Sequence, residues 1–365
     1  MSFEILKSKK DYDENIDIEN TLYYICNELR QYTLHNNYNK TNTLSENTFK
    51  QVRLDCDRSF GSDDNIDDEQ EVIYQNELYH IIINILSKDP SLHYYQGYHD
   101  IVALFLYMFT EYDTYNEKLQ YKIVSCREEL VNIIFNFTEL YLIDFMKENI
   151  NDTLLYLNYI PKILKKLDYK LYKTLTACNS NNFKFTLSNI ITLFNHDIEN
   201  NKYHHKLLVL KYLVKTSNIS FILILYSQLL IEVNNEIYTL FDENREKNDD
   251  ILIIQFKINN LVNEYLNKLP ANKFEVLLNK TNSLMKLYKI QSIFKYSLKN
   301  KHLLINFNFN AEKSALIKLS IVSVNLFMLA QMKTEPSPFA PLSTSPKSII
   351  TYAFSLFNIY KTISS

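Results

Sequence analysis

The sequence has very few of the residues that make tight turns. Its 365 residues include only two glycines, Gly61 and Gly97. A P-loop or a dinucleotide-binding fingerprint needs several glycines close together, because its backbone must approach phosphate closely. Both kinds of nucleotide site are therefore excluded. Most all-β architectures are excluded as well, since tight hairpin turns need residues that tolerate positive φ.

Proline is also scarce over most of the chain. Three of the seven prolines, Pro90, Pro161 and Pro270, precede residue 335, and the other four lie between residues 336 and 346. A long chain that is almost free of glycine and proline favours helices. The sequence therefore predicts an all-α protein.

The charged residues and the cysteines exclude further classes. The 39 basic and 42 acidic side chains give a net charge of −3, so the chain lacks the basic patch of a nucleic-acid-binding protein. The four cysteines show no C-x-x-C spacing, which predicts neither a zinc site nor a disulfide framework and favours a reducing, cytosolic setting. The adjacent His204 and His205 are expected at the surface and not as metal ligands. Residues 1–10 are polar and do not resemble a signal peptide.

Apolar periodicity divides the chain into helices. The predicted helices cover about residues 18–38, 45–60, 78–88, 101–108, 117–146, 153–166, 184–197, 204–215, 219–233, 251–268, 273–288 and 311–332. Ser45 is the expected N-cap of the second helix, and Gly61 lies where its C-terminus is expected. Residues 62–71 and 242–250 are predicted to be charged, solvated linkers, and residues 1–17 a flexible N-terminus.

Two long apolar runs require a decision about the membrane. Residues 219–233 are too few for a bilayer span, which needs roughly 20 residues, so they predict a buried core helix. Residues 315–332 are longer, with Lys318 near one end and Asn325 in the middle. A terminal lysine can snorkel to the interface and one asparagine is tolerated, so this segment is either a marginal span or an interfacial amphipathic helix.

The segment Val52–Ser59 contains a possible functional pair. Asp55 and Arg58 are i, i+3 neighbours on a helix, so the carboxylate can orient the guanidinium. Such pairs are also common on solvated helix surfaces, where they contribute little. Two of the five arginines of the chain, Arg53 and Arg58, lie here.

The segment His93–Asp100 (HYYQGYHD) contains the second glycine. Gly97 lies between a helix stop at Asp89-Pro90 and an apolar helix. The glycine either lets the backbone turn or lets a partner approach the backbone closely. The physical chemistry of the sequence does not choose between these two interpretations.

Together the two segments resemble the TBC-domain GTPase-activating proteins. V-x-x-D-x-x-R-S at 52–59 is similar to the I-x-x-D-x-x-R-T motif of that family, and Tyr94-x-Gln96-Gly97 to its Y-x-Q-G motif. The resemblance covers about residues 46–235 and looks closer to the membrane-anchored members of the early secretory pathway. Ser59 replaces the usual threonine. Asn189 and Leu193 stand where tryptophans are usual, which puts the packing there in question.

The resemblance implies a function and a mechanism. A Rab-family GTPase in its GTP-bound state would be the partner, with Arg58 and Gln96 as catalytic fingers that are supplied in trans. The resemblance assigns finger-orienting or partner-binding roles to Asp55, Ser59, Tyr94, Gly97 and Asp100. No cofactor or metal of its own is expected, because GTP and magnesium belong to the Rab.

The resemblance also implies a domain order and a location. A Rab-GAP domain is expected over residues 18–241, a helical extension over 242–314, a membrane-spanning or interfacial helix over 315–332 and a Pro/Ser-containing tail over 333–365. The protein would be anchored at the endoplasmic reticulum or early secretory pathway, with the TBC domain in the cytosol. One rival hypothesis is a TBC-fold module that binds a Rab or a membrane tether without catalysis. A second and weaker one is a structural helical scaffold on a membrane.

Overall fold

The structure is a computed structural model of the chain. It describes residues 18–31, 43–61, 68–108, 110–113, 118–123, 127–177, 183–247 and 251–287. The chain divides into two units, Met1–Asn306 and Phe307–Ser365, and the second lies outside the described residues. The flexible N-terminus, the apolar segment 315–332 and the tail that the sequence predicts also lie outside them.

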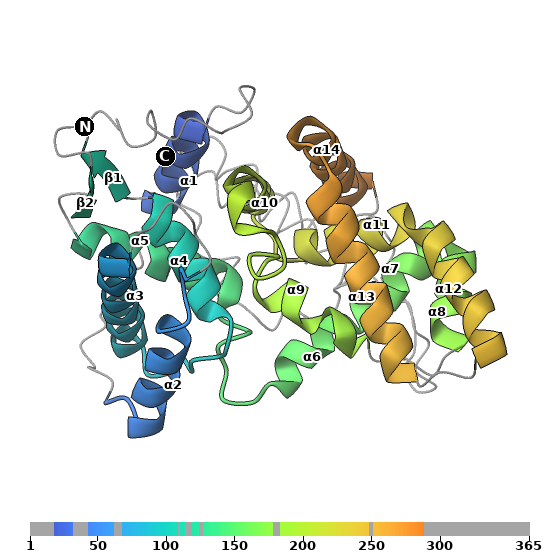
Figure 1. The fold of residues 1–365 in the computed structure, drawn as a ribbon, viewed down its shortest axis with the longest axis horizontal. Coiled ribbons are helices and arrows are strands. Elements are labelled where there is room, and N and C mark those ends of the chain that lie inside the picture. The colour runs from blue at the N-terminus through green and yellow to red at the C-terminus, as the bar shows by residue number, and fades with distance from the viewer. Residues whose placement is uncertain are drawn as a thin grey trace, which may run out of the picture. The chain divides into compact units, whose positions relative to one another are not determined.

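The described elements are mostly helical (Figure 1). The helices are α1 Ile18–Arg30, α2 Glu46–Cys56, α3 Asp68–Lys88, α4 Tyr98–Met108, α5 Arg127–Phe137, α6 Asn151–Leu157, α7 Tyr159–Leu167, α8 Tyr169–Ala177, α9 Leu187–Ile191, α10 Tyr203–Thr216, α11 Ser220–Glu232, α12 Asn234–Lys247, α13 Ile251–Lys268 and α14 Ala271–Leu287. Two short 3₁₀ segments, Lys184–Thr186 and Asn200–Lys202, precede α9 and α10.

Helix α2 begins as the sequence predicts and ends earlier. The Ser45 hydroxyl oxygen accepts a hydrogen bond from the Thr48 amide at 3.1 Å, which confirms Ser45 as the N-cap. The last helical residue is Cys56, and the predicted helical end at Gly61 is wrong. Phe60, with φ of 72°, takes the left-handed conformation that was expected of Gly61.

Helix α3 confirms the predicted amphipathic helix. Its apolar residues at the helical spacing i, i+3, i+4, i+7 and i+8 are all fully buried: Leu78, Ile81, Ile82, Ile85 and Leu86. Helix α3 stops at Lys88, just before Asp89-Pro90. It begins at Asp68, so the last four residues of the predicted charged linker are its first helical turn.

A β-hairpin replaces the start of the predicted helix 117–146. Strands β1 (Thr110–Asp113) and β2 (Lys118–Ile123) pair antiparallel, with Thr110 opposite Ile123. The sequence of β2, KLQYKI, alternates polar and apolar residues, a period-2 pattern that favours a strand over a helix. Helix α5 then runs from Arg127, and a π-helical turn, Thr138–Leu142, continues it. The fold is thus helical apart from this hairpin.

The predicted helix 153–166 is two helices. Helix α6 ends at Leu157 and α7 begins at Tyr159, so Pro161 lies in the first turn of α7. Proline is tolerated there, whereas inside one continuous helix its ring would clash with the carbonyl of Leu157. The predicted helix 184–197 is also shorter, because α9 ends at Ile191 and the chain continues as a series of turns to residue 197.

The later helices form the second part of the core. Helix α11 is buried from Ser220 to Leu230, which confirms a core helix over this apolar run. Helices α13 and α14 pack against α11, and α14 also packs against α10. Helix α12 extends to Lys247 and replaces most of the second predicted linker. Among the described helices, none is both long and apolar enough to cross a membrane.

One of the two adjacent histidines is not at the surface. The side chain of His205 is buried, and its Nε2 lies 3.0 Å from the carbonyl oxygen of Leu269. Burial lowers the pKa of His205 to about 3. The expectation of two surface histidines was therefore wrong for His205, which is a buried neutral ring in the packing of α10 against α14.

Candidate functional site

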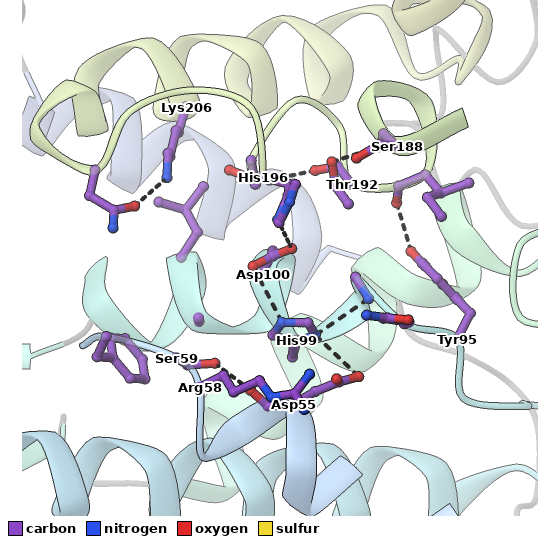
Figure 2. Close-up of a pocket in the computed structure, with 18 of the residues that line it drawn as sticks. Asp55, Arg58, Ser59, Tyr95, His99, Asp100, Ser188, Thr192, His196 and Lys206 are labelled. Atoms are coloured by element: carbon purple, nitrogen blue, oxygen red, sulfur yellow. Dashed lines mark hydrogen bonds and ion pairs between the residues drawn. The ribbon is translucent and has the colours of Figure 1, made fainter. Parts of the chain in front are cut away.

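A cleft of about 730 Å³ brings together segments that are far apart in the sequence (Figure 2). Its near wall consists of residues from 55–60 and 95–107, and its far wall of residues from 187–206. The near wall comes from the end of α2 and the turn after it, and from the turn before α4 and one face of α4. The far wall comes from α9, the turns after it and the start of α10.

Arg58 and Gln96 both line this cleft. Both residues are exposed. Within the described part of the chain, the guanidinium of Arg58 makes no hydrogen bond or ion pair. A planar cation that is always charged and a carboxamide thus line the same cleft, where both are open to a group that enters it.

Asp55 contacts the arginine segment through its backbone and not through its carboxylate. The expected Asp55–Arg58 ion pair is absent among the described contacts, and Asp55 Oδ2 instead accepts a hydrogen bond from the Tyr94 hydroxyl at 2.8 Å. The backbone oxygen of Asp55 accepts from the Arg58 amide at 3.3 Å and from Ser59 Oγ at 3.0 Å. Burial and the bond to Asp55 raise the pKa of Tyr94, so its hydroxyl remains a donor.

The other arginine of the segment has a separate, structural environment. Arg53 forms an ion pair with Asp57 at 2.6 Å and donates a hydrogen bond to Asn76 Oδ1 at 2.7 Å. Its guanidinium carbon lies 5.5 Å from the centre of the Tyr79 ring. Arg53 does not line the cleft.

The turn that carries Gln96 is tied to a histidine. The Gly97 amide donates to Nδ1 of His99 at 3.3 Å, so Nδ1 is an acceptor and the ring proton lies on Nε2. That Nε2 is 3.5 Å from Asp100 Oδ1. His99 therefore ties the turn at Gly97 to the near wall and lies beside Asp100, an environment that the motif alone does not reveal.

Gly97 is required by the fold of this chain itself. Its φ is +104°, a conformation that side-chain-bearing residues rarely adopt. A Cβ at this position would also lie 2.8 Å from Cγ2 of Thr192 on the far wall. The turn and the close approach to Thr192 each account for the glycine without any partner.

The far wall contains a strained turn. Leu193 and Phe194 have φ values of 52° and 65°, and both side chains are fully buried. Left-handed conformations at such residues cost of order 1–3 kcal/mol each and persist only where the surroundings enforce them. Asn189 and Leu193 occupy the positions where the resemblance led us to expect tryptophans. Both side chains are buried, so these positions belong to the core without large aromatic rings.

Helix α13 holds this turn through a row of asparagines. Asn263 Nδ2 donates to Asp197 Oδ1 at 2.9 Å, and Asn263 Oδ1 accepts from Asn189 Nδ2 at 2.9 Å. Asn267 Nδ2 donates to the Asp197 backbone oxygen at 2.8 Å. Burial raises the pKa of Asp197. Sequence reasoning missed these residues; the available signal was asparagine at every fourth position, 259, 263 and 267, along one side of an amphipathic helix.

Two polar contacts join the walls, as Figure 2 shows. The Tyr95 hydroxyl donates to the Ile191 backbone oxygen at 2.8 Å. His196 Nδ1 lies 3.3 Å from Asp100 Oδ2, and the hydrogen bond between them raises the pKa of His196. Tyr95 and His196 are further residues of the cleft that the motifs did not indicate.

The fold and the cleft define a helical domain with an exposed arginine and an exposed glutamine at one cleft. The family model of the Rab-GTPase-TBC domain matches residues 15–205, just over half of the chain. The chain belongs to this family.

Individual relatives support the same assignment. The chain is 32% identical over 209 residues to the GTPase-activating protein GYP8 of Saccharomyces cerevisiae, a match that covers 54% of this chain and 41% of that protein. It is 33% identical over 149 residues to TBC1 domain family member 20 of Mus musculus, covering 40% of this chain and 33% of that protein. The matches thus span less than half the length of these relatives.

A solved structure shares the fold. The Ypt/Rab-GAP domain of Gyp1p superposes with a TM-score of 0.52 at 18% identity, covering 74% of this chain and 81% of that one. At this identity the likeness concerns the fold alone. It extends past the range of the family match, since three quarters of the chain is included.

Proposed function

We propose that this protein accelerates GTP hydrolysis by a Rab-family GTPase. The observation that carries the proposal is the placement of Arg58 and Gln96 at one cleft, both exposed, in a chain of the Rab-GTPase-TBC family. The partner would be the GTP-bound form, because the two side chains suit the γ-phosphate and the attacking water. The nucleotide and its magnesium ion come with the Rab.

Arg58 supplies charge in this mechanism. Negative charge on the transferring phosphoryl group is poorly stabilised in a GTPase alone, and an arginine that is supplied in trans contributes roughly 10³–10⁵ in rate. The guanidinium has a planar fork of donors and no deprotonated form at neutral pH, so it suits phosphate oxygens better than lysine does.

Gln96 orients the nucleophile. A carboxamide accepts a hydrogen bond from the attacking water through its oxygen and donates one to a phosphoryl oxygen through its nitrogen. In this role Gln96 takes over from the glutamine of the Rab itself. Asp55, Ser59 and Tyr94 hold the backbone on either side of the two fingers, and Asp100 anchors the near wall to the far wall.

The location follows from the sequence beyond the described residues. We propose that residues 315–332 anchor the protein to a membrane, either across it or in its interface, because this run is apolar with a lysine near one end. The TBC domain would then lie on the cytosolic face of the endoplasmic reticulum or of the early secretory pathway, where it would meet its Rab. Vesicles that bind the full chain and not residues 1–310 would support this anchor, and equal binding would contradict it.

The test of the activity uses a panel of purified Rab proteins loaded with GTP. The full chain is expected to accelerate hydrolysis by at least one of them, while Arg58→Ala and Arg58→Lys lose nearly all of the stimulation. Stimulation by both variants at the wild-type rate would contradict the role of Arg58. Arg53→Lys is the matched control, since Arg53 lies in the same segment outside the cleft.

The rival function is a non-catalytic Rab-binding module. The intact pair of fingers favours catalysis, because a binding module has no need of both. Tight binding of a GTP-loaded Rab without acceleration, at any ratio of the two proteins, would favour the rival.

A further inference from the structure

The guanidinium of Arg58 has no partner among the described residues, so its direction depends on the backbone that carries it. This backbone, residues 57–59, follows the last turn of α2 and precedes the left-handed Phe60. The backbone amides of this segment donate to the last turn of α2, at 2.9 Å from Asp57 to Arg53, 3.3 Å from Arg58 to Asp55 and 3.0 Å from Ser59 to Cys56. The carbonyl oxygens of Asp57 and Ser59 are instead bonded from outside the segment.

One buried side chain on α3 contacts the segment on both sides of the arginine. Gln75 Nε2 donates to the Asp57 backbone oxygen at 3.1 Å and to the Ser59 backbone oxygen at 3.2 Å. These oxygens belong to the peptide groups that precede Arg58 and follow Ser59. Gln75 is 8% exposed and does not line the cleft, so it does not touch a partner in the cleft.

The amide of Gln75 is oriented by its own helix. Nε2 also donates to Glu71 Oε1, one turn earlier on α3, at 2.7 Å. All three neighbours of this nitrogen are acceptors, which identifies it as the donor end of the amide. Two hydrogens serve three oxygens, so the donor capacity of the group is fully used.

We propose that Gln75 is the positioning residue of the arginine finger, a conclusion that rests on the proposed function. Gln75 fixes the peptide planes around Arg58 and thereby the direction of its Cα–Cβ bond toward the cleft. Without Gln75 the arginine is still present and exposed, and it samples positions that do not meet the phosphoryl group. A misplacement of about 1 Å at a reacting group can cost on the order of 100-fold in rate.

The experiment measures single-turnover GTP hydrolysis by the responding Rab with increasing amounts of the full chain. Gln75→Met keeps the length of the side chain and removes its donors. The expected result is a maximal rate lowered about 10- to 100-fold, with the concentration of half-maximal effect within about two-fold of wild type, because the Rab-binding surface is unchanged. The melting temperature is measured alongside.

Asn76→Ala is the matched control. Asn76 is the next residue on α3 and bonds Arg53, the arginine outside the cleft, so this variant should retain the wild-type maximal rate. If Gln75→Met does not fold, Gln75→Asn, which is one methylene shorter, takes its place and is judged by the same two parameters.

The outcomes separate the inference from the function on which it rests. A lowered maximal rate for the Gln75 variant, with Asn76→Ala unaffected, supports the inference. A wild-type maximal rate for the Gln75 variant overturns the inference, and so does a loss of rate that matches the unfolded fraction of this variant. In both cases Arg58→Ala still abolishes stimulation, so the proposed function stands. Full stimulation by Arg58→Ala in the same assay would instead overturn the role of Arg58 itself.

Discussion

The two walls of the cleft are stabilised in different ways. The near wall carries Arg58 and Gln96, and its two segments bond each other directly, as in the hydrogen bond from Tyr94 to Asp55, 39 positions apart. The far wall depends on Asn263 of α13, which lies 66 and 74 positions from Asp197 and Asn189. The near wall places the chemical groups, and the far wall supplies a rigid surface that faces them.

This difference shows why a family motif describes only half of the site. The match to the Rab-GTPase-TBC family ends at residue 205, before α13 begins at Ile251. The strained turn at Leu193 and Phe194 is nevertheless held by that later helix. A variant on each wall should therefore have a distinct effect, on rate for the near wall and on stability for the far wall.

After the loss of Arg58, the largest effect is expected for Gln96→Ala on the near wall. Loss of one group that acts on the transition state costs about 100- to 1000-fold in rate. Because Gln96 is exposed, the variant should fold like the wild type. Single-turnover hydrolysis and a melting curve test both expectations, and an unchanged rate would mean that the Rab uses its own glutamine.

Gly97→Ala should damage the contact between the walls. The variant combines a φ of +104° with a Cβ 2.8 Å from Thr192 Cγ2, and we expect a loss of about 3 kcal/mol in the free energy of unfolding. Gly61→Ala is the matched control at the other glycine, where a Cβ would meet only the flexible carboxylate of Glu71 at 3.2 Å. Denaturant unfolding of the two variants checks the contrast, and equal losses would contradict it.

Asn263→Ala tests the support of the far wall. It removes one donor to Asp197 and one acceptor from Asn189, so we expect a loss of about 1–2 kcal/mol in unfolding free energy. Asn260→Ala, on the same helix, removes no hydrogen bond among the described residues. If the two variants melt at the same temperature, α13 does not support the far wall as described.

The smallest effect concerns the pH dependence of the link between Asp100 and His196. The hydrogen bond to Asp100 raises the pKa of His196 in the folded protein. The stabilisation by this hydrogen bond is therefore complete below the unfolded pKa of about 6.5 and is lost as the pH rises through the folded pKa. The side chain of His196 is 63% exposed, which keeps the effect small. Melting temperatures of wild type and His196→Gln should differ most near pH 6 and converge by pH 9, and a constant difference would contradict this.

The sequence predicted the near wall far better than the far wall. The spacing of Asp55, Arg58 and Gln96 was visible in the motifs, the apolar face of α3 followed from its 3.6-residue period, and α4 followed from its apolar run. The partner of the Asp55 carboxylate was not visible, because a bond to Tyr94 depends on how α2 packs beside the turn before α4.

The far wall was predicted as part of a regular helix. Leu193 and Phe194 fit an apolar helical pattern, and that pattern does not reveal the contacts from α13 to Asn189 and Asp197 on either side of their left-handed turn. The hairpin at 110–123 was missed for a different reason, since the alternation in β2 is short and adjoins the strong helical period of α5.

We propose that this chain supplies both catalytic side chains, Arg58 and Gln96, to the GTP-hydrolysing site of the Rab. The most direct measurement is GTP hydrolysis by the responding Rab after its own catalytic glutamine is replaced with leucine. We expect that the wild-type chain still accelerates this Rab variant and that Gln96→Ala does not. A Rab variant that no longer responds to the wild-type chain would contradict the claim.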